Sequence, residues 1–151
     1  MLQVRRLQSY SSIVLWAGNN ENEAALVQDW YGTDADWEKY RRDYLNLYQN
    51  TIEATVQVED PHRAFVLSSP SNGVIATQQA GGINSNPTDS LFGDIHVYSY
   101  YSDGWSPSSY PQGPRFVSEY GWQSFPKYLS HCYYYCYSFH FIISSPLASK
   151  F

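Results

Sequence analysis

Short apolar runs, separated by polar or glycine-rich stretches, set the pattern of this sequence. The first strand-like stretch begins with the apolar run at residues 13–15 and stops at Gly18. Residues 63–69 form a second one. Residues 94–100 alternate between polar and apolar side chains, and residues 114–119 form another short β-prone run. Alternation with period two and short apolar runs that end at turn residues are typical of β-strands. The pattern therefore predicts four strands.

Two helices are predicted between the first and second strands. Residues 23–31 are helix-prone and end at Gly32, a residue that suits the position after a helix C-terminus. A longer helix begins after Thr33 or Asp34, either of which can cap it, and stops at the Asp60-Pro61 pair. Large apolar side chains recur along it at helical spacing, and we expect them to face the core. They are Trp37, Tyr40, Tyr44, Leu47 or Tyr48, and Ile52.

The order of these elements indicates the fold class. Residues 1–10 match the end of an amphipathic helix, and strand, helix, strand, loop, strand, loop and strand follow. The loop at 70–93 shows no convincing amphipathic helix, and the loop at 102–113 carries Trp105. Consecutive strand and crossover units of this kind build parallel barrels, so we predict an α/β fold that is a partial (β/α)8 TIM barrel.

Length and composition limit the classes of function. With 151 residues the chain is long enough for one core, whereas a complete (β/α)8 barrel typically needs ~250. The net charge of −5 gives no reason to expect nucleic acid or an anionic membrane surface as a partner. Aromatic residues make up 18% of the chain, which suits both a packed core and stacking on sugars. A carbohydrate-binding module without catalysis therefore stays open as a hypothesis.

The two ends of the chain differ from its middle. We predict the partial barrel over residues 1–126 and a foreign-looking tail over 127–151. This tail is Tyr-rich, almost uncharged, and disordered or prone to aggregate. The apolar run of the tail is too short for a transmembrane helix, which needs ~20 residues. Residues 1–6 lack the apolar segment of a signal peptide. We predict no zinc site in the tail, because its candidate ligands have no second cluster beside them. These ligands are His131, Cys132, Cys136 and His140.

Two glutamates stand at the ends of predicted strands. Residues 16–23, Trp-Ala-Gly-Asn-Asn-Glu-Asn-Glu, follow the first strand and place Glu21 just before a helix. Residues 114–124 bring Glu119 to the end of the fourth strand, before aromatic residues and a glycine. The carboxyl ends of barrel strands carry the chemistry of such folds, so these two glutamates are a candidate acid pair. Taken alone, the first stretch is equally a helix N-cap with an acidic first turn.

Together the two stretches resemble the catalytic core of the β-mannosidases of glycoside hydrolase family 2. The resemblance runs from about Val4 to Phe125 and includes intermediate blocks at 68–73 and 92–98. It implies that the predicted strands are strands four to seven of eight, and that no metal ion or organic cofactor takes part. It also implies a parent enzyme that is lysosomal or secreted. The sequence departs from the family at residues 9–12, where a His-Pro pair is expected.

The resemblance assigns the chemistry to individual side chains. Glu21 is the expected acid/base and Glu119 the expected nucleophile of a retaining glycosidase. Glu23 is the rival acid, but Glu21 directly follows the asparagine pair, as in the family motif. Asn20 is expected to hydrogen-bond the 2-hydroxyl of the sugar, the position at which mannose differs from glucose.

Further side chains are candidates for the sugar subsite. His96 and Tyr98 point to the same face of their strand, although His96 is equally well explained as a structural core residue. Trp105 is either a stacking platform for the sugar or ordinary loop packing. Arg115, Tyr98 or Tyr120 can keep a nearby carboxylate ionised by hydrogen bonding.

Two main hypotheses follow for the function of this chain. The first is a β-mannosidase that releases terminal non-reducing residues from a β-mannoside oligosaccharide. The second is a catalytically inactive, truncated fragment or isoform of such an enzyme, because a partial barrel has open sheet edges that favour self-association. A β-galactoside or β-glucuronide specificity is disfavoured by the Asn-Asn-Glu form of the motif.

Overall fold

The computed structural model describes residues 2–98, 108 and 113–121, and Trp105 and the tail at 127–151 lie outside them. Among the described residues, no helix is long and apolar enough to cross a membrane. The strands are β1 Leu15–Ala17, β2 Ala64–Val66, β3 Ile95–Tyr98 and β4 Val117–Gly121. The helical segments are α1 Leu2–Leu7, α2 Asn22–Val27, η1 Asp34–Asp36, α3 Trp37–Tyr44, η2 Leu45–Glu53, α4 Ala54–Glu59 and α5 Gly73–Gln79.

The strands form two parallel pairs, as an α/β fold requires. β1 pairs with β2, and β3 pairs with β4 so that His96 lies opposite Glu119. The pairs are separate two-stranded sheets, because β2 and β3 do not form a ladder with each other. An isolated antiparallel bridge between Ser71 and Asp94 stands where a barrel has parallel pairing. Parallel pairing is therefore confirmed, whereas the described residues form no closed barrel.

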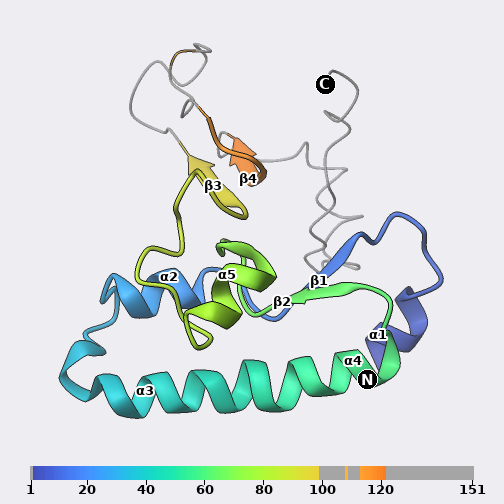
Figure 1. Ribbon diagram of the computed structural model, residues 1–151, viewed down its shortest axis with the longest axis horizontal. Helices are drawn as coiled ribbons and strands as arrows, with labels where there is room; N and C mark the ends of the chain where they lie inside the picture. Colours follow the sequence, from blue (N-terminus) through green and yellow to red (C-terminus); the bar gives the residue numbers. More distant parts are fainter. Residues whose placement is uncertain (1, 99–107, 109–112, 122–151) are drawn as a thin grey trace, which may run out of the picture.

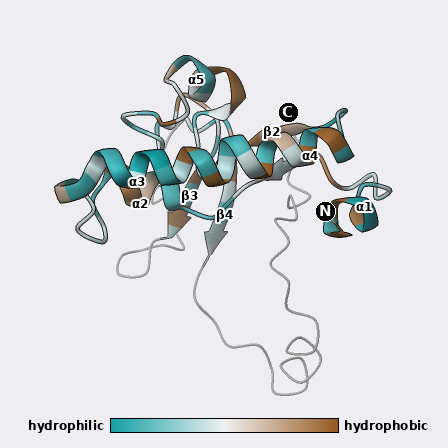
Figure 2. Ribbon diagram, turned by 90° about the horizontal axis from the view of Figure 1, so that it is seen from below, coloured by the Kyte–Doolittle hydropathy of each residue, from teal (hydrophilic) through white to brown (hydrophobic). Residues whose placement is uncertain are grey.

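A long helix made of α3, η2 and α4 runs along one side of the β1–β2 pair (Figure 1). Its middle segment, η2, is π-helical, and its last residue is Glu59, so the predicted stop at Asp60-Pro61 is confirmed. Seen from below, the α3 part of this helix is mainly hydrophilic (Figure 2). At its C-terminal end, an ion pair between Arg5 and Glu59 connects α1 to α4.

The core lies between the long helix, α1, α2 and the β2 strand. Trp37, Tyr48 and Ile52 of the predicted apolar stripe pack against it, so the prediction is confirmed for them. Tyr40 and Leu47 are exposed instead. Both line an open hollow beside α2. The buried core residues are Val4, Leu26, Tyr44, Val56, Phe65 and Leu67.

The first strand ends just before Gly18, as predicted, but it is not buried. It spans Leu15–Ala17, and Val14 before it is 71% exposed. Among the described residues β1 has a hydrogen-bonded neighbour on one edge only, so no strand there covers the apolar side chains at its start. A cavity of about 350 Å³, lined by Val14, Leu15 and Phe116 among others, opens at this place.

The segment predicted as a loop between the second and third strands contains a helix, α5. Two β-branched residues at its start, Val74 and Ile75, lower its intrinsic helix propensity, which explains the wrong prediction. Packing decides the conformation here, because α5 lies against β2 and its Thr77 is buried. Asn84 Nδ2 donates a hydrogen bond to Thr77 Oγ1 at 2.9 Å and holds the following loop to the helix.

Gly82 lies where the loop after α5 meets the long helix. A Cβ added there would collide with Leu45 Cδ2 and would lie 2.9 Å from Gln49 Oε1. Gly32 has a similar positive φ, +70° against +93°, but no heavy atom lies within 4 Å of its added Cβ. The two glycines therefore share backbone strain on substitution and differ in crowding.

We expect Gly82→Ala to lower the free energy of unfolding by about 1–3 kcal/mol more than Gly32→Ala does, because only the first overpacks the core. Urea unfolding followed by circular dichroism measures both values. Equal losses in the two variants would show that the loop after α5 does not pack tightly against the long helix.

Candidate functional site

The chain segments after β1 and β2 stay side by side and position Glu21. Glu21 N donates to Ser69 O at 2.7 Å, and Ser69 N donates to Asn19 O at 3.0 Å. A Cβ at Gly18 would lie 2.6 Å from the carbonyl oxygen of Leu67, so the close approach of the two segments requires glycine. Glu21 has a φ of 61°, a left-handed conformation that costs a non-glycine residue roughly 1–2 kcal/mol. The chain therefore turns sharply at this glutamate.

The side chain of Asn19 holds this turn together. Its Nδ2 donates to Leu67 O at 2.8 Å, while its Oδ1 accepts from Ser68 Oγ at 2.7 Å and from Asn22 N at 3.0 Å. The sequence did not predict this role, because two of the three partners lie 48 and 49 residues away along the chain. Asn19 therefore connects the segment after β2 to the turn that carries Glu21.

Four side chains from three segments meet where the turn after β1 reaches β3 and β4, and Glu119 lies in the middle of β4 rather than at its end. His96 Nδ1 lies 2.7 Å from Glu21 Oε1 and 3.4 Å from Glu119 Oε2. Tyr98 Oη donates a hydrogen bond to Glu119 Oε2 at 2.8 Å. The prediction that Glu21 and Glu119 come together is consistent with this geometry, and His96 and Tyr98 extend from the same face of β3.

Asp94 forms a second layer of hydrogen bonds behind this cluster. Its Oδ2 accepts from Ser69 Oγ and from Ser118 Oγ, each at 2.7 Å, and its Oδ1 accepts from Ser71 N at 2.9 Å. Ser69 Oγ also lies 3.2 Å from His96 Nε2. Asp94 thus connects the segment after β2, β3 and β4 at one point.

The cluster is partly open to solvent. The side chains of Glu21 and Glu119 are 31% and 28% exposed, whereas that of His96 is 5% exposed. One carboxylate oxygen of Glu21, one of Glu119 and one ring nitrogen of His96 lie within 4.8 Å of one another. Three such atoms at this spacing could also coordinate a metal ion. The hydrogen bonds to His96 and Tyr98 account for these atoms without an ion.

Glu23, the rival acid, lies elsewhere. It is fully buried in the first turn of α2, and its Oε1 accepts from Asn84 N at 2.7 Å and from Asn84 Nδ2 at 3.1 Å. Its Oε2 has no hydrogen-bond partner among the described residues. Burial raises the pKa of Glu23, and the two bonds from Asn84 offset only part of this effect. Glu23 therefore holds the loop after α5 rather than facing the cluster.

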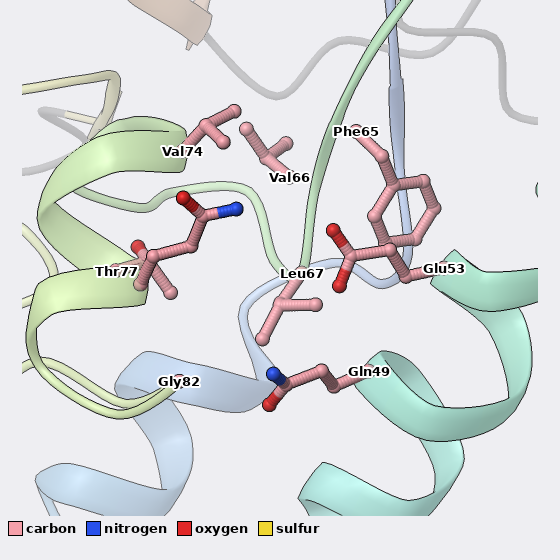
Figure 3. A pocket seen from close by; sticks show the side chains of 9 residues that line it. Gln49, Glu53, Phe65, Val66, Leu67, Val74, Thr77 and Gly82 are labelled. Atoms are coloured by element: carbon pink, nitrogen blue, oxygen red, sulfur yellow. The ribbon is translucent and has the colours of Figure 1, made fainter. Parts of the chain in front are cut away.

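The enclosed hollow beside the long helix is not part of the cluster. It lies between η2, β2 and α5, and Gln49 and Glu53 of the helix point toward Phe65 and Leu67 across it (Figure 3). Its volume of about 20 Å³ holds little more than one water molecule. We regard it as a packing gap, since none of the clustered side chains lines it.

The remaining predicted site residues are less informative. Asn20 is exposed beside Glu21, and its backbone bridges to Ser69. Tyr98, one of the three side chains considered as partners for the nucleophile, hydrogen-bonds Glu119. Trp105 lies outside the described residues.

Comparisons with known proteins place these observations in a family context. No family model matches the chain. It is 47% identical over 127 residues to a β-mannosidase of Capra hircus and, over the same length, to a β-mannosidase of Bos taurus. A probable β-mannosidase of Caenorhabditis elegans is 40% identical over 124 residues. The two mammalian matches cover 83% of this chain but only 14% of the relatives, so the chain spans a small part of their length.

Glu23 makes the stability of the chain depend on pH. Because its pKa is raised above the ordinary value of 4.5, its contribution is complete below about pH 4.5 and is lost as the pH rises through the raised pKa. The free energy of unfolding therefore falls as the pH rises through this range. We expect Glu23→Gln to remove the part of this fall that comes from Glu23. Urea unfolding at a series of pH values measures it.

Glu38→Gln, on the exposed side of α3, controls for the change in net charge. If Glu23→Gln and the unsubstituted chain lose stability equally as the pH rises, the buried carboxyl is not the cause.

Proposed function

This chain is homologous to one segment of the β-mannosidases, and we propose that the segment carries the acid/base and the nucleophile of a retaining β-mannosidase. Glu21 is the proposed acid/base and Glu119 the proposed nucleophile. The observation that carries the proposal is the spacing of their carboxyl oxygens, one of each lying within 4.8 Å of the other. Retaining glycosidases need carboxyl groups ~5–5.5 Å apart, and inverting ones ~6.5–9.5 Å apart.

The surroundings of Glu119 suit a nucleophile. Tyr98 Oη donates to its Oε2, which stabilises the ionised carboxylate. In the first half of the reaction, a Glu119 oxygen attacks the anomeric carbon as the bond from that carbon to the leaving oxygen breaks. The product of this step is a glycosyl ester on Glu119.

Glu21 serves both halves of the proposed reaction. It first gives its proton to the leaving glycosidic oxygen, so that the aglycone departs as a neutral alcohol. It then takes a proton from a water molecule whose oxygen attacks the anomeric carbon, and the ester to Glu119 breaks. The exposed Asn20, next to Glu21, is the proposed partner of the sugar 2-hydroxyl.

A second candidate function is an inactive segment that has both glutamates but cannot turn over substrate. The open edge of β1 favours it, because Val14 and Leu15 are exposed beside an unfilled cavity of about 350 Å³. In a complete barrel, neighbouring strands cover such apolar side chains.

Hydrolysis of a β-mannoside distinguishes the two candidates. We expect the chain to release the aglycone of a chromogenic β-mannoside, Glu119→Ala to abolish release, and Glu21→Ala to reduce it about 10²–10⁴-fold when the leaving group is poor. The reduction should be smaller with an acidic phenol as leaving group, because that group departs without a proton. Glu38→Ala is the matched control on the exposed face of α3.

A trapping experiment tests the nucleophile without turnover. We expect a 2-deoxy-2-fluoro-β-mannosyl fluoride to form an ester with Glu119, detected as a mass increase of the peptide that contains it. A folded chain that neither hydrolyses the substrate nor forms this ester contradicts the enzymatic proposal and supports the inactive segment.

A further inference from the structure

His96 is held by a different partner at each ring nitrogen. Its Nδ1 lies 2.7 Å from Glu21 Oε1, and its Nε2 lies 3.2 Å from Ser69 Oγ. The ring is 5% exposed, so solvent contributes little to placing its protons. In a neutral imidazole one nitrogen donates and the other accepts, and the partners decide which is which.

The hydroxyl of Ser69 has one hydrogen to give. Ser69 Oγ donates it to Asp94 Oδ2 at 2.7 Å, and the other two neighbours of the Asp94 carboxyl, Ser118 Oγ and Ser71 N, are donors as well. A carboxyl surrounded by three donors acts as an acceptor. Ser69 therefore has only a lone pair left for His96, and His96 Nε2 must carry a hydrogen to use it.

We infer that Asp94, acting through Ser69, is a positioning residue that keeps a proton on Nε2 of His96. Nδ1 is then the nitrogen that gains and loses a proton, and it faces Glu21. We call the chain of contacts from Asp94 through Ser69 to His96 the Asp94 relay. Its geometry does not depend on the proposed function of Glu21, whereas its role in catalysis does.

The relay determines what lies between His96 and Glu21. Two lone pairs do not approach to 2.7 Å favourably, so a proton occupies the space between Nδ1 and Oε1 and belongs to the pair. In the proposed reaction, this is the proton that the leaving oxygen takes up and that the attacking water later returns. The pair therefore ends the cycle with the same number of protons as it began.

Several charged or titratable groups surround this pair. Glu119, on β4, faces Nδ1 from 3.4 Å, and Tyr98 hydrogen-bonds that same carboxyl oxygen. Asp94 acts on the other side of the ring through Ser69, and its charge also contributes to the raised pKa of the buried Glu23. The two glutamates face Nδ1, whereas the Asp94 relay acts on Nε2.

Nitrogen-15 NMR of the full chain tests the inference directly. We expect Nε2 of His96 to show a pyrrole-type shift, whereas Nδ1, which shares its proton with Glu21, shows the shift of a partly protonated nitrogen. His96→Gln assigns the signals by removing them from the spectrum. A pyridine-type shift at Nε2 in the unsubstituted chain would overturn the inference, and this measurement needs no folded variant of Asp94.

Asp94→Asn should reverse the tautomer. Its carboxamide oxygen can keep the bond from Ser71 N, and its amide then donates to Ser69, whose hydrogen turns to Nε2 of His96. We expect the pyrrole-type signal to move to Nδ1, whereas Asp89→Asn, a loss of the same charge from a loop residue that bonds Leu91 N, leaves it at Nε2. An unchanged tautomer in folded Asp94→Asn contradicts the relay.

The outcomes separate this inference from the proposed function. A chain with the expected tautomer that hydrolyses no β-mannoside keeps the relay and loses the enzymatic proposal. A chain that hydrolyses the substrate but has no proton on Nε2 of His96 keeps the proposal and loses the relay.

Discussion

Parallel pairing that continues past the ends of β1 and β2 is the constraint on which the candidate site depends. The two segments remain in contact through backbone hydrogen bonds between Glu21, Ser69 and Asn19, and Gly18 allows the approach. Since both strands run in the same direction, everything that follows them emerges at one edge. A left-handed residue at Glu21 then turns its carboxylate toward β3 and β4. Without this extended pairing, the two glutamates would belong to unrelated surfaces.

Local sequence signals were enough to predict the strands and the approach of the two glutamates. Glu21 follows a β-prone run and Glu119 belongs to one, and parallel strands place such residues near one another. The environment of Glu23 was not predictable in the same way, because its partner Asn84 is 61 residues away. Helix α5 was missed for a related reason, since its own residues favour extended structure and only packing against β2 makes it helical. Long-range contacts, which a short sequence window does not contain, account for both differences.

The gap between a barrel and the two observed sheets has a physical basis in the length of the chain. It covers 14% of its mammalian relatives, and β1 has a pairing partner on one edge alone among the described residues. Apolar side chains at the start of β1 are therefore exposed, whereas Asp94, Ser69 and Ser118 near the strand ends hydrogen-bond one another. The polar layer around Asp94 holds together without the missing neighbours because its partners all come from within this segment.

Ser69 lies beyond the end of β2 and contacts both parts of the candidate site. Its backbone bonds the turn that carries Glu21, and its side chain bonds Asp94 and approaches His96 on β3. Together with the Glu21–His96 hydrogen bond and the backbone bridge between Ser71 and Asp94, it connects the two separate sheets. A displacement of one sheet relative to the other would strain these contacts together and change the distance between Glu21 and Glu119. The spacing of the two carboxylates is in this sense a mechanical property of the chain, set by how stiffly these few contacts hold the sheets.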